Sequence, residues 1–280
     1  MRSHGEREEN AAGERRNEHR PQHAADPPRS RVLRPPSPSK GRHVRGKLEV
    51  GETAAKRATL PAENGGCYFV ALTGGPCSGK STATPRLRSL LEAHGYDVFV
   101  VGEVATRVIA ATRTPSPGWT ELEQAAFQAL LLRSQLADED AVRASAALWS
   151  RPVVVLCDRG CLDGKAFCAG RVWRAALRLA GVSETELLRR YRGVVNLECP
   201  AASSAPWAAD VYEFGPGSGN PSRWHTAAQA VEAGKAGAAA WAPHPRFASV
   251  GVYPCFDDKV AAVADCVLAG LRADGWAPTL

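Results

Sequence analysis

The sequence lacks long apolar runs, and no stretch of 18 or more consecutive apolar residues occurs among its 280 residues. A membrane-spanning helix needs about 20 such residues, so we expect none. The first 30 residues also lack the apolar stretch of a secretory signal. An organelle transit peptide is rich in arginine and poor in acids, and five glutamates among the first 20 residues depart from that pattern. We therefore expect a cytoplasmic protein and leave organelle targeting by the N-terminal segment open.

Residues 1–64 have no tryptophan, tyrosine or phenylalanine, and they hold seven prolines. Such a segment cannot bury enough apolar surface to offset the entropy that is lost on ordering. We predict a disordered, basic, Pro- and Arg-rich tail over residues 1–65 and one folded domain over residues 66–276.

The excess of positive charge is confined to the same segment. Residues 1–64 hold 14 Lys or Arg against 9 Asp or Glu, whereas residues 65–280 hold 21 against 20. The sequence pI of about 9.0 therefore describes mainly the tail, and we expect no nucleic-acid partner. An anionic phospholipid surface is a candidate partner of the tail, although the scattered acids would dilute the attraction.

Short apolar runs alternate with helical patterns in the remainder of the chain. The predicted strands cover residues 68–73, 97–101, 152–157, 194–197 and about 246–252. The predicted helices cover residues 79–94, 120–148, 162–180, 184–191 and a final stripe at about 260–271. Buried strands that alternate with helices indicate an α/β fold with a five-stranded parallel sheet and helices on both faces. Residues 200–242 fit this pattern least well and are predicted to form a mobile lid.

A glycine-rich segment directly after the first strand matches the P-loop pattern Gly-x4-Gly-Lys-Ser/Thr. In such a loop, backbone N–H groups and the following helix N-terminus hold phosphate oxygens. Lys80 would reach the outer phosphates, and the Ser81 hydroxyl would bind Mg²⁺. The predicted nucleotide-binding residues are Gly74, Gly75, Pro76, Cys77, Ser78, Gly79, Lys80, Ser81 and Thr82.

The third strand ends in a carboxylate, Asp158, which is typical of a Walker B acid. Asp158 would hold Mg²⁺ or its water together with Ser81, although many strands end in aspartate. Arg159 follows directly and would face the transferring phosphate; the alternative is a surface arginine.

Two charged residues follow the second strand, and ligands of such sheets bind at the carboxyl ends of strands. Glu103 could accept a proton from an attacking hydroxyl, or it could be a helix-start glutamate that interacts with the helix dipole. Arg107 is a candidate nucleotide contact. His244 could contact a base or ribose, or could be a structural loop histidine. No Asn-Lys-x-Asp tetrad is present, so the sequence leaves ATP and GTP open.

These motifs together resemble the family of P-loop domains found in NadR and in the TRPL translocation defect proteins, and the chain looks closer to the eukaryotic branch. The resemblance spans roughly residues 67–270. Its motifs are Ala71–Thr82, Glu103–Arg107, Leu156–Gly160 with Asp163, Asn220–Arg223, His244-Pro245 and Phe256-x-x-Lys259. The chain departs from the family pattern at Gly102, at Pro85 inside the first helix, and in the charge-poor stretch 200–219.

The resemblance implies a P-loop NTPase fold of the nucleoside or nucleotide kinase type, with Mg²⁺ and ATP or GTP. A kinase would transfer phosphate to an unidentified small-molecule acceptor, with Lys80, Arg159 and Arg223 as catalytic cations and Glu103 and Asp158 as catalytic carboxylates. The alternative is a nucleotide-switched protein that binds GTP and phosphoinositides in membrane-protein trafficking.

Overall fold

The computed structural model describes residues 66–112, 118–148, 152–204, 206, 208, 226–276 and 278. Five strands form one sheet in the order β2-β3-β1-β4-β5, and every neighbouring pair is parallel. The strands are β1 (Cys67–Thr73), β2 (Asp97–Val101), β3 (Val153–Asp158), β4 (Gly193–Leu197) and β5 (Phe247–Val250). The predicted α/β fold with a five-stranded parallel sheet is confirmed.

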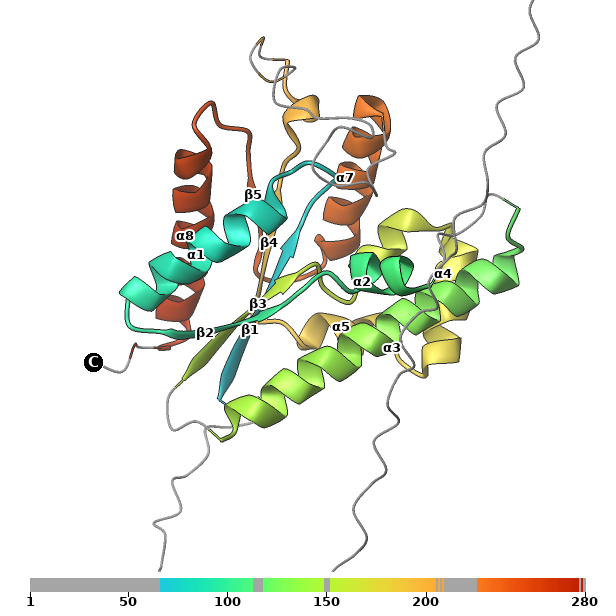
Figure 1. Cartoon of the computed structure of the whole chain (residues 1–280), viewed down its shortest axis with the longest axis horizontal. Coiled ribbons are helices and arrows are strands. Elements are labelled where there is room, and N and C mark those ends of the chain that lie inside the picture. The colour runs from blue at the N-terminus through green and yellow to red at the C-terminus, as the bar shows by residue number, and fades with distance from the viewer. Residues whose placement is uncertain are drawn as a thin grey trace, which may run out of the picture. The chain divides into compact units, whose positions relative to one another are not determined.

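Helices cover both faces of the sheet (Figure 1). On one face lie α1 (Lys80–Ala93) and α8 (Phe256–Ala273). The other face is covered chiefly by α3 (Glu121–Ala146), α4 (Gly170–Ala180), α5 (Glu184–Arg189) and α7 (Ala227–Trp241). The shorter elements are α2 (Val104–Ala111) and the 3₁₀ turns η1 (Asp163–Phe167) and η2 (Pro200–Ala202).

The core is divided by the alternation of side chains along the strands. Tyr68, Val70 and Leu72 of β1 pack toward α1 and α8. Phe69 and Ala71 of the same strand face the cluster formed with α3, α4 and the end of α7. All seven residues of β1 are buried, as expected for a central strand covered twice.

Local capping boxes open three of the described α-helices. The capping boxes predicted at Thr120 and Ser183 both form, and a third at Thr226 opens α7. The predicted helix over residues 162–180 is instead η1 followed by α4, because Cys168 and Ala169 are extended. Helix α1 continues through Pro85 to Ala93.

Two of the sequence predictions fall largely on residues that are not described. The tail over residues 1–65 and Arg223 lie outside the described residues. Within the segment predicted as a lid, residues 227–241 form α7, and residues 209–225 lie outside the description. The mobility of this segment stays a prediction.

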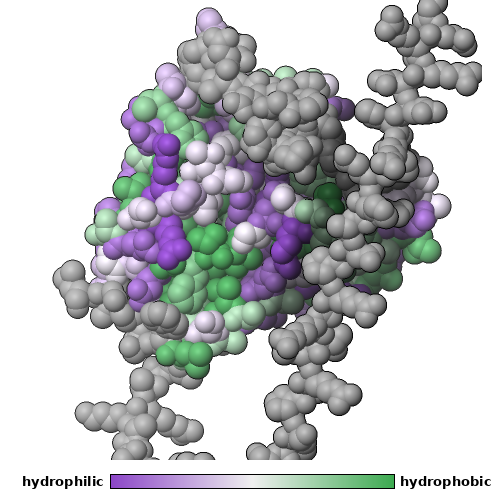
Figure 2. All heavy atoms as spheres, viewed as in Figure 1, coloured by the Kyte–Doolittle hydropathy of each residue, from purple (hydrophilic) through white to green (hydrophobic). Residues whose placement is uncertain are grey.

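The side of the molecule that faces the viewer in Figure 1 has a mixed surface, on which hydrophobic areas lie between hydrophilic ones (Figure 2). Across the described ranges, no helix combines the length and the apolar character that crossing a membrane would require.

Candidate nucleotide site

The loop between β1 and α1 has a backbone that two glycines make possible. Gly74 has φ +137°, and a Cβ there would lie 2.2 Å from the Leu197 carbonyl oxygen. Gly79 has φ +91°, and a Cβ there would lie 2.6 Å from the ring of Phe256. Both positions therefore need glycine for conformation and for space. Neighbouring strand β4 and helix α8 thus fix the course of the loop.

Lys80 is the first residue of α1, and its side chain is enclosed by the loop that precedes it. The ammonium donates to the carbonyl oxygens of Gly74 and Gly75, both at 2.9 Å, and to Ser78 Oγ at 3.0 Å. Burial lowers the pKa of Lys80 to about 8, with a smaller contribution from Arg159. The charge therefore lies within the loop where phosphate oxygens would bind.

Ser81 and Asp158 form the pair predicted to hold Mg²⁺. The Ser81 hydroxyl donates to Asp158 Oδ2 at 2.9 Å, and Asp158 ends β3 beside the loop. Asp158 Oδ1 is buried without a hydrogen-bond partner. Burial raises the pKa of Asp158, whereas the charge of Lys80 opposes the rise.

A hydroxyl next to an orphaned carboxylate oxygen fits the oxygen ligands that Mg²⁺ prefers. The described residues contain no group of three or more His, Cys, Asp or Glu side chains that could hold a metal.

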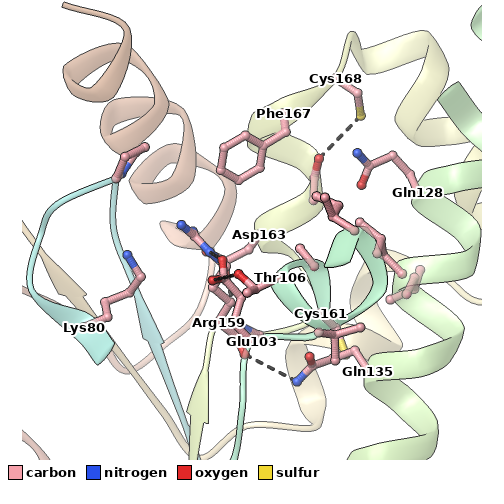
Figure 3. A pocket seen from close by; sticks show the side chains of 18 of the residues that line it. Lys80, Glu103, Thr106, Gln128, Gln135, Arg159, Cys161, Asp163, Phe167 and Cys168 are labelled. Carbon is pink, nitrogen blue, oxygen red and sulfur yellow. Dashed lines mark hydrogen bonds and ion pairs between the residues drawn. The ribbon is translucent and has the colours of Figure 1, made fainter. Parts of the chain in front are cut away.

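Arg159 crosses the cavity beside the loop and is not a surface residue, since its side chain is only 15% exposed. Its Nε donates to Glu103 Oε1 at 2.5 Å, and Nη1 donates to the Gly74 carbonyl at 3.2 Å and to Asp163 Oδ1 at 3.3 Å. The guanidinium also lies 5.3 Å from the centre of the Phe167 ring. Figure 3 shows Arg159 between Lys80 and Phe167.

Glu103 precedes α2, but its side chain does not cap that helix. Its second oxygen accepts a hydrogen bond from Thr106 Oγ1 at 2.6 Å. Burial would raise the pKa of Glu103, but Arg159 and the Thr106 hydroxyl outweigh it and hold the pKa below its ordinary value. The carboxylate is thus ionised and faces the cavity.

Arg107 is not brought to this site. Its guanidinium pairs with Asp138 of α3, the side chain is 59% exposed, and it does not line the cavity. His244 is the structural histidine of the two alternatives. It is 5% exposed, its Nε2 lies 3.0 Å from the Tyr191 carbonyl, and its Nδ1 accepts from the Arg246 N–H.

The loop opens into a cavity of about 450 Å³ that extends away from the phosphate-binding backbone. The far side of the cavity is apolar and aromatic, and sequence reasoning did not find it. Its walls include Trp119, Phe127, Leu131, Phe167 and Trp173. Lys80 and Gln128 lie on opposite sides of the cavity (Figure 3). Gln128 Oε1 is buried without a hydrogen-bond partner.

Asp163, noted in the sequence only within the resemblance, joins three parts of the site. It accepts hydrogen bonds from Thr73 at the end of β1 (2.6 Å), from the Gly160 N–H (2.8 Å) and from Trp241 of α7 (3.1 Å). Lys259 of α8 similarly donates to the carbonyls of Ser78 (2.9 Å) and Glu198 (2.6 Å). No local pattern in the sequence could have paired these residues.

The glycine-rich loop encloses the buried Lys80, and Ser81 pairs with Asp158 at the end of the neighbouring strand β3. This combination places the protein in the class of P-loop nucleotide-binding domains. Comparison with protein families goes one step further. A family model described as an AAA domain matches residues 69–217, which is more than half of the chain. The protein therefore belongs to this AAA-domain family. A search of curated proteins finds no match.

Proposed function

We propose that the protein binds ATP or GTP with Mg²⁺ and transfers a phosphoryl group to a small-molecule acceptor. One observation carries the proposal: the phosphate-binding loop and an aromatic-walled space belong to the same cavity of about 450 Å³. A volume of that size suits a small ligand, and a few polar groups among apolar walls are typical of small-molecule sites. The family resemblance, which implies a fold of the nucleoside or nucleotide kinase type, supports the same proposal.

The residues around the cavity have roles that follow from their chemistry. Lys80 and Arg159 would stabilise the charge on the transferring phosphate. Bound Mg²⁺, held by Ser81 and Asp158, would neutralise the phosphate oxygens. The ionised Glu103 would accept a hydrogen bond from the acceptor hydroxyl. As the hydroxyl oxygen bonds to the terminal phosphorus and the bond to the bridging oxygen breaks, the hydroxyl proton passes to Glu103.

Trp119, Phe127 and Phe167 would bind the apolar part of the acceptor, and Gln128 would accept a hydrogen bond from it. The Trp119 and Phe127 rings pack edge to face with centroids 5.4 Å apart, which holds this wall in place. In this proposal the phosphate donor would lie at the phosphate-binding loop, and the acceptor would lie against the aromatic wall.

A screen for phosphate transfer tests the proposal. The full-length protein would be incubated with ATP or GTP and a panel of nucleosides and inositol lipids, with Lys80→Ala as the inactive control. We expect a phosphorylated product that requires Lys80, and a higher KM for the acceptor in Phe127→Ala. Tight nucleotide binding without any transfer would contradict the proposal.

That negative outcome would favour the second candidate, a nucleotide-switched protein acting at a membrane surface. The observation behind it is the charge of residues 1–64, with 14 basic residues against 9 acidic ones. A switch needs no acceptor, so Phe127→Ala would then leave nucleotide binding and hydrolysis unchanged.

A further inference from the structure

A second group of buried polar side chains surrounds Glu139 of α3, next to the backbone of residues 159–161 and away from the phosphate-binding loop. Glu139 of α3 is fully buried. Its carboxylate accepts hydrogen bonds from the Tyr191 hydroxyl, from Gln135 Nε2 (2.9 Å), from Arg190 Nε (2.7 Å) and from the Cys161 thiol (3.5 Å). Burying a carboxylate is costly even when it is paired, so such a network needs a reason.

Two members of this network hold the backbone that carries Arg159. The Tyr191 hydroxyl donates to Glu139 and accepts from the Cys161 N–H at 2.7 Å. Gln135 donates to Glu139 and lies 3.4 Å from the Arg159 carbonyl. Figure 3 shows the contact between Gln135 and the backbone of Arg159. The network therefore makes hydrogen bonds with the backbone at both ends of the segment 159–161.

These hydrogen bonds matter because the backbone of Arg159 has an unfavourable conformation, with φ +72°. Residues with a Cβ rarely adopt this left-handed conformation, and it persists where the surroundings over-determine it. The Arg159 N–H donates to the Leu72 carbonyl at 3.0 Å, and the Gly160 N–H donates to Asp163. Relaxation of φ to negative values would turn the guanidinium away from Glu103 and the Gly74 carbonyl.

We propose that Glu139 and Tyr191 are positioning residues that hold Arg159 in its left-handed conformation and so fix the guanidinium beside the phosphate-binding loop. Neither side chain lines the cavity, so neither would touch a ligand there directly. The catalytic consequence rests on the proposed function, in which Arg159 faces the transferring phosphate. The placement of Arg159 itself does not depend on that function.

The first test measures the position of Arg159 without any reaction. In the full chain, Tyr191→Phe removes the hydroxyl that joins Glu139 to the Cys161 N–H. The Arg159 Nε–H resonance in ¹⁵N NMR spectra would be assigned by its loss in Arg159→Lys. We expect this resonance to shift or broaden in Tyr191→Phe, because the Nε–H bond to Glu103 loosens.

Tyr96→Phe is the matched control. The Tyr96 hydroxyl is part-buried and donates to a backbone carbonyl, that of Trp276, at 2.8 Å on the other face of the sheet. Loss of this hydroxyl should lower stability without moving the Arg159 resonance. An Arg159 resonance that is unchanged in Tyr191→Phe would overturn the proposal, whatever reaction the protein performs.

The second test is a double-mutant cycle on the phosphate-transfer rate. Tyr191→Phe should lower kcat about 10- to 100-fold, as expected for a small misplacement of a catalytic group, and leave nucleotide affinity within about twofold. In an Arg159→Ala background the same change should have no further effect on kcat. Additive losses would show that Tyr191 does not act through Arg159.

Glu139→Gln provides a second variant if Tyr191→Phe does not fold. It keeps the shape of the side chain, and Arg190 retains Asp140 as a partner at 2.6 Å. Absence of transfer in the parent protein would refute the proposed function alone, because the resonance experiment would still decide whether this network positions Arg159.

Discussion

Glu103 and Arg159 show how single residues set the chemistry of the cavity. The Arg159 guanidinium holds the pKa of Glu103 low, so the carboxylate is ionised at neutral pH. A carboxylate in this state accepts a hydrogen bond readily but is a weak base. Its proposed role is therefore to orient the acceptor hydroxyl and to take the proton late in the reaction.

Glu103→Gln should lower the transfer rate by about 10²–10⁴, the usual range for loss of a general base. Nucleotide affinity should change little, because the loop backbone and Lys80 carry that binding. kcat, nucleotide affinity and melting temperature would be measured on the same protein. Glu186→Gln is the control, since glutamine also completes a capping box there. An unchanged kcat would remove Glu103 from the mechanism.

Lys259 is a buried cation outside the catalytic set, and it makes a pH prediction possible. Burial lowers its pKa from an ordinary 10.5 to about 8. Between these values the unfolded chain binds one more proton than the folded chain, so stability rises with pH. Below pH 8, Lys259 is protonated in both the folded and the unfolded chain, so the burial of its charge lowers the free energy of unfolding by the full amount.

The free energy of unfolding of the parent, minus that of Lys259→Met, should therefore increase by up to about 3 kcal/mol between pH 8 and 10.5. Urea titrations at a series of pH values would measure it, and the similarly shifted Lys80 cancels in the difference. A difference that is flat with pH would mean that Lys259 is not buried as a cation.

At the level of elements, helix α7 lies directly against the phosphate-binding loop. A Cβ on Gly75 would lie 2.5 Å from the Ala230 carbonyl oxygen and 3.2 Å from Gly234 Cα. The helix backbone and the loop backbone are thus in contact, which small residues on both sides permit. The position of α7 and the shape of the loop depend on each other.

Gly75→Ala should weaken nucleotide binding at least tenfold, because a Cβ at this position cannot be accommodated unless α7 or the loop moves. Calorimetric titration with ATP and GTP would measure the loss. Gly102→Ala is the matched control, because nothing lies within 4 Å of a Cβ there. Equal affinities in the two variants would mean that contact with α7 does not shape the loop.

At the scale of the whole molecule, the excess positive charge and the candidate nucleotide site lie in different parts of the chain. The positive excess lies in residues 1–64, whereas the residues of the cavity belong to a nearly neutral remainder of the chain. Nucleotide binding and attraction to anionic surfaces should therefore be separable properties.

Deletion of residues 1–64 should leave nucleotide affinity unchanged, because their composition does not favour a defined pocket and the described residues that line the cavity fall between Pro76 and Trp173. A tenfold loss, about 1.4 kcal/mol, would contradict this. The same deletion should weaken binding to vesicles that contain anionic lipid, and more strongly at low salt. Vesicle binding that survives the deletion would remove the tail from any membrane role.

The sequence by itself determined the features that depend on neighbouring residues. The loop from Gly74 to Ser81, the strand that ends in Asp158 and the capping boxes at Thr120 and Ser183 are local patterns, and each has the conformation that its pattern predicts. Parallel strands followed from apolar runs that alternate with helices. These parts could be read because backbone conformation and burial period are encoded within a few residues.

Only the tertiary structure decided which side chains meet across the sheet. Arg107 pairs with Asp138 rather than approaching the loop, while Asp163 joins Thr73 and Trp241, which lie 90 and 78 residues away along the chain. The aromatic wall of the cavity and the hydrogen bond from the Cys161 N–H to the Tyr191 hydroxyl also join residues from different elements. Such contacts are set by the packing of helices on the sheet, and no spacing within one segment specifies them.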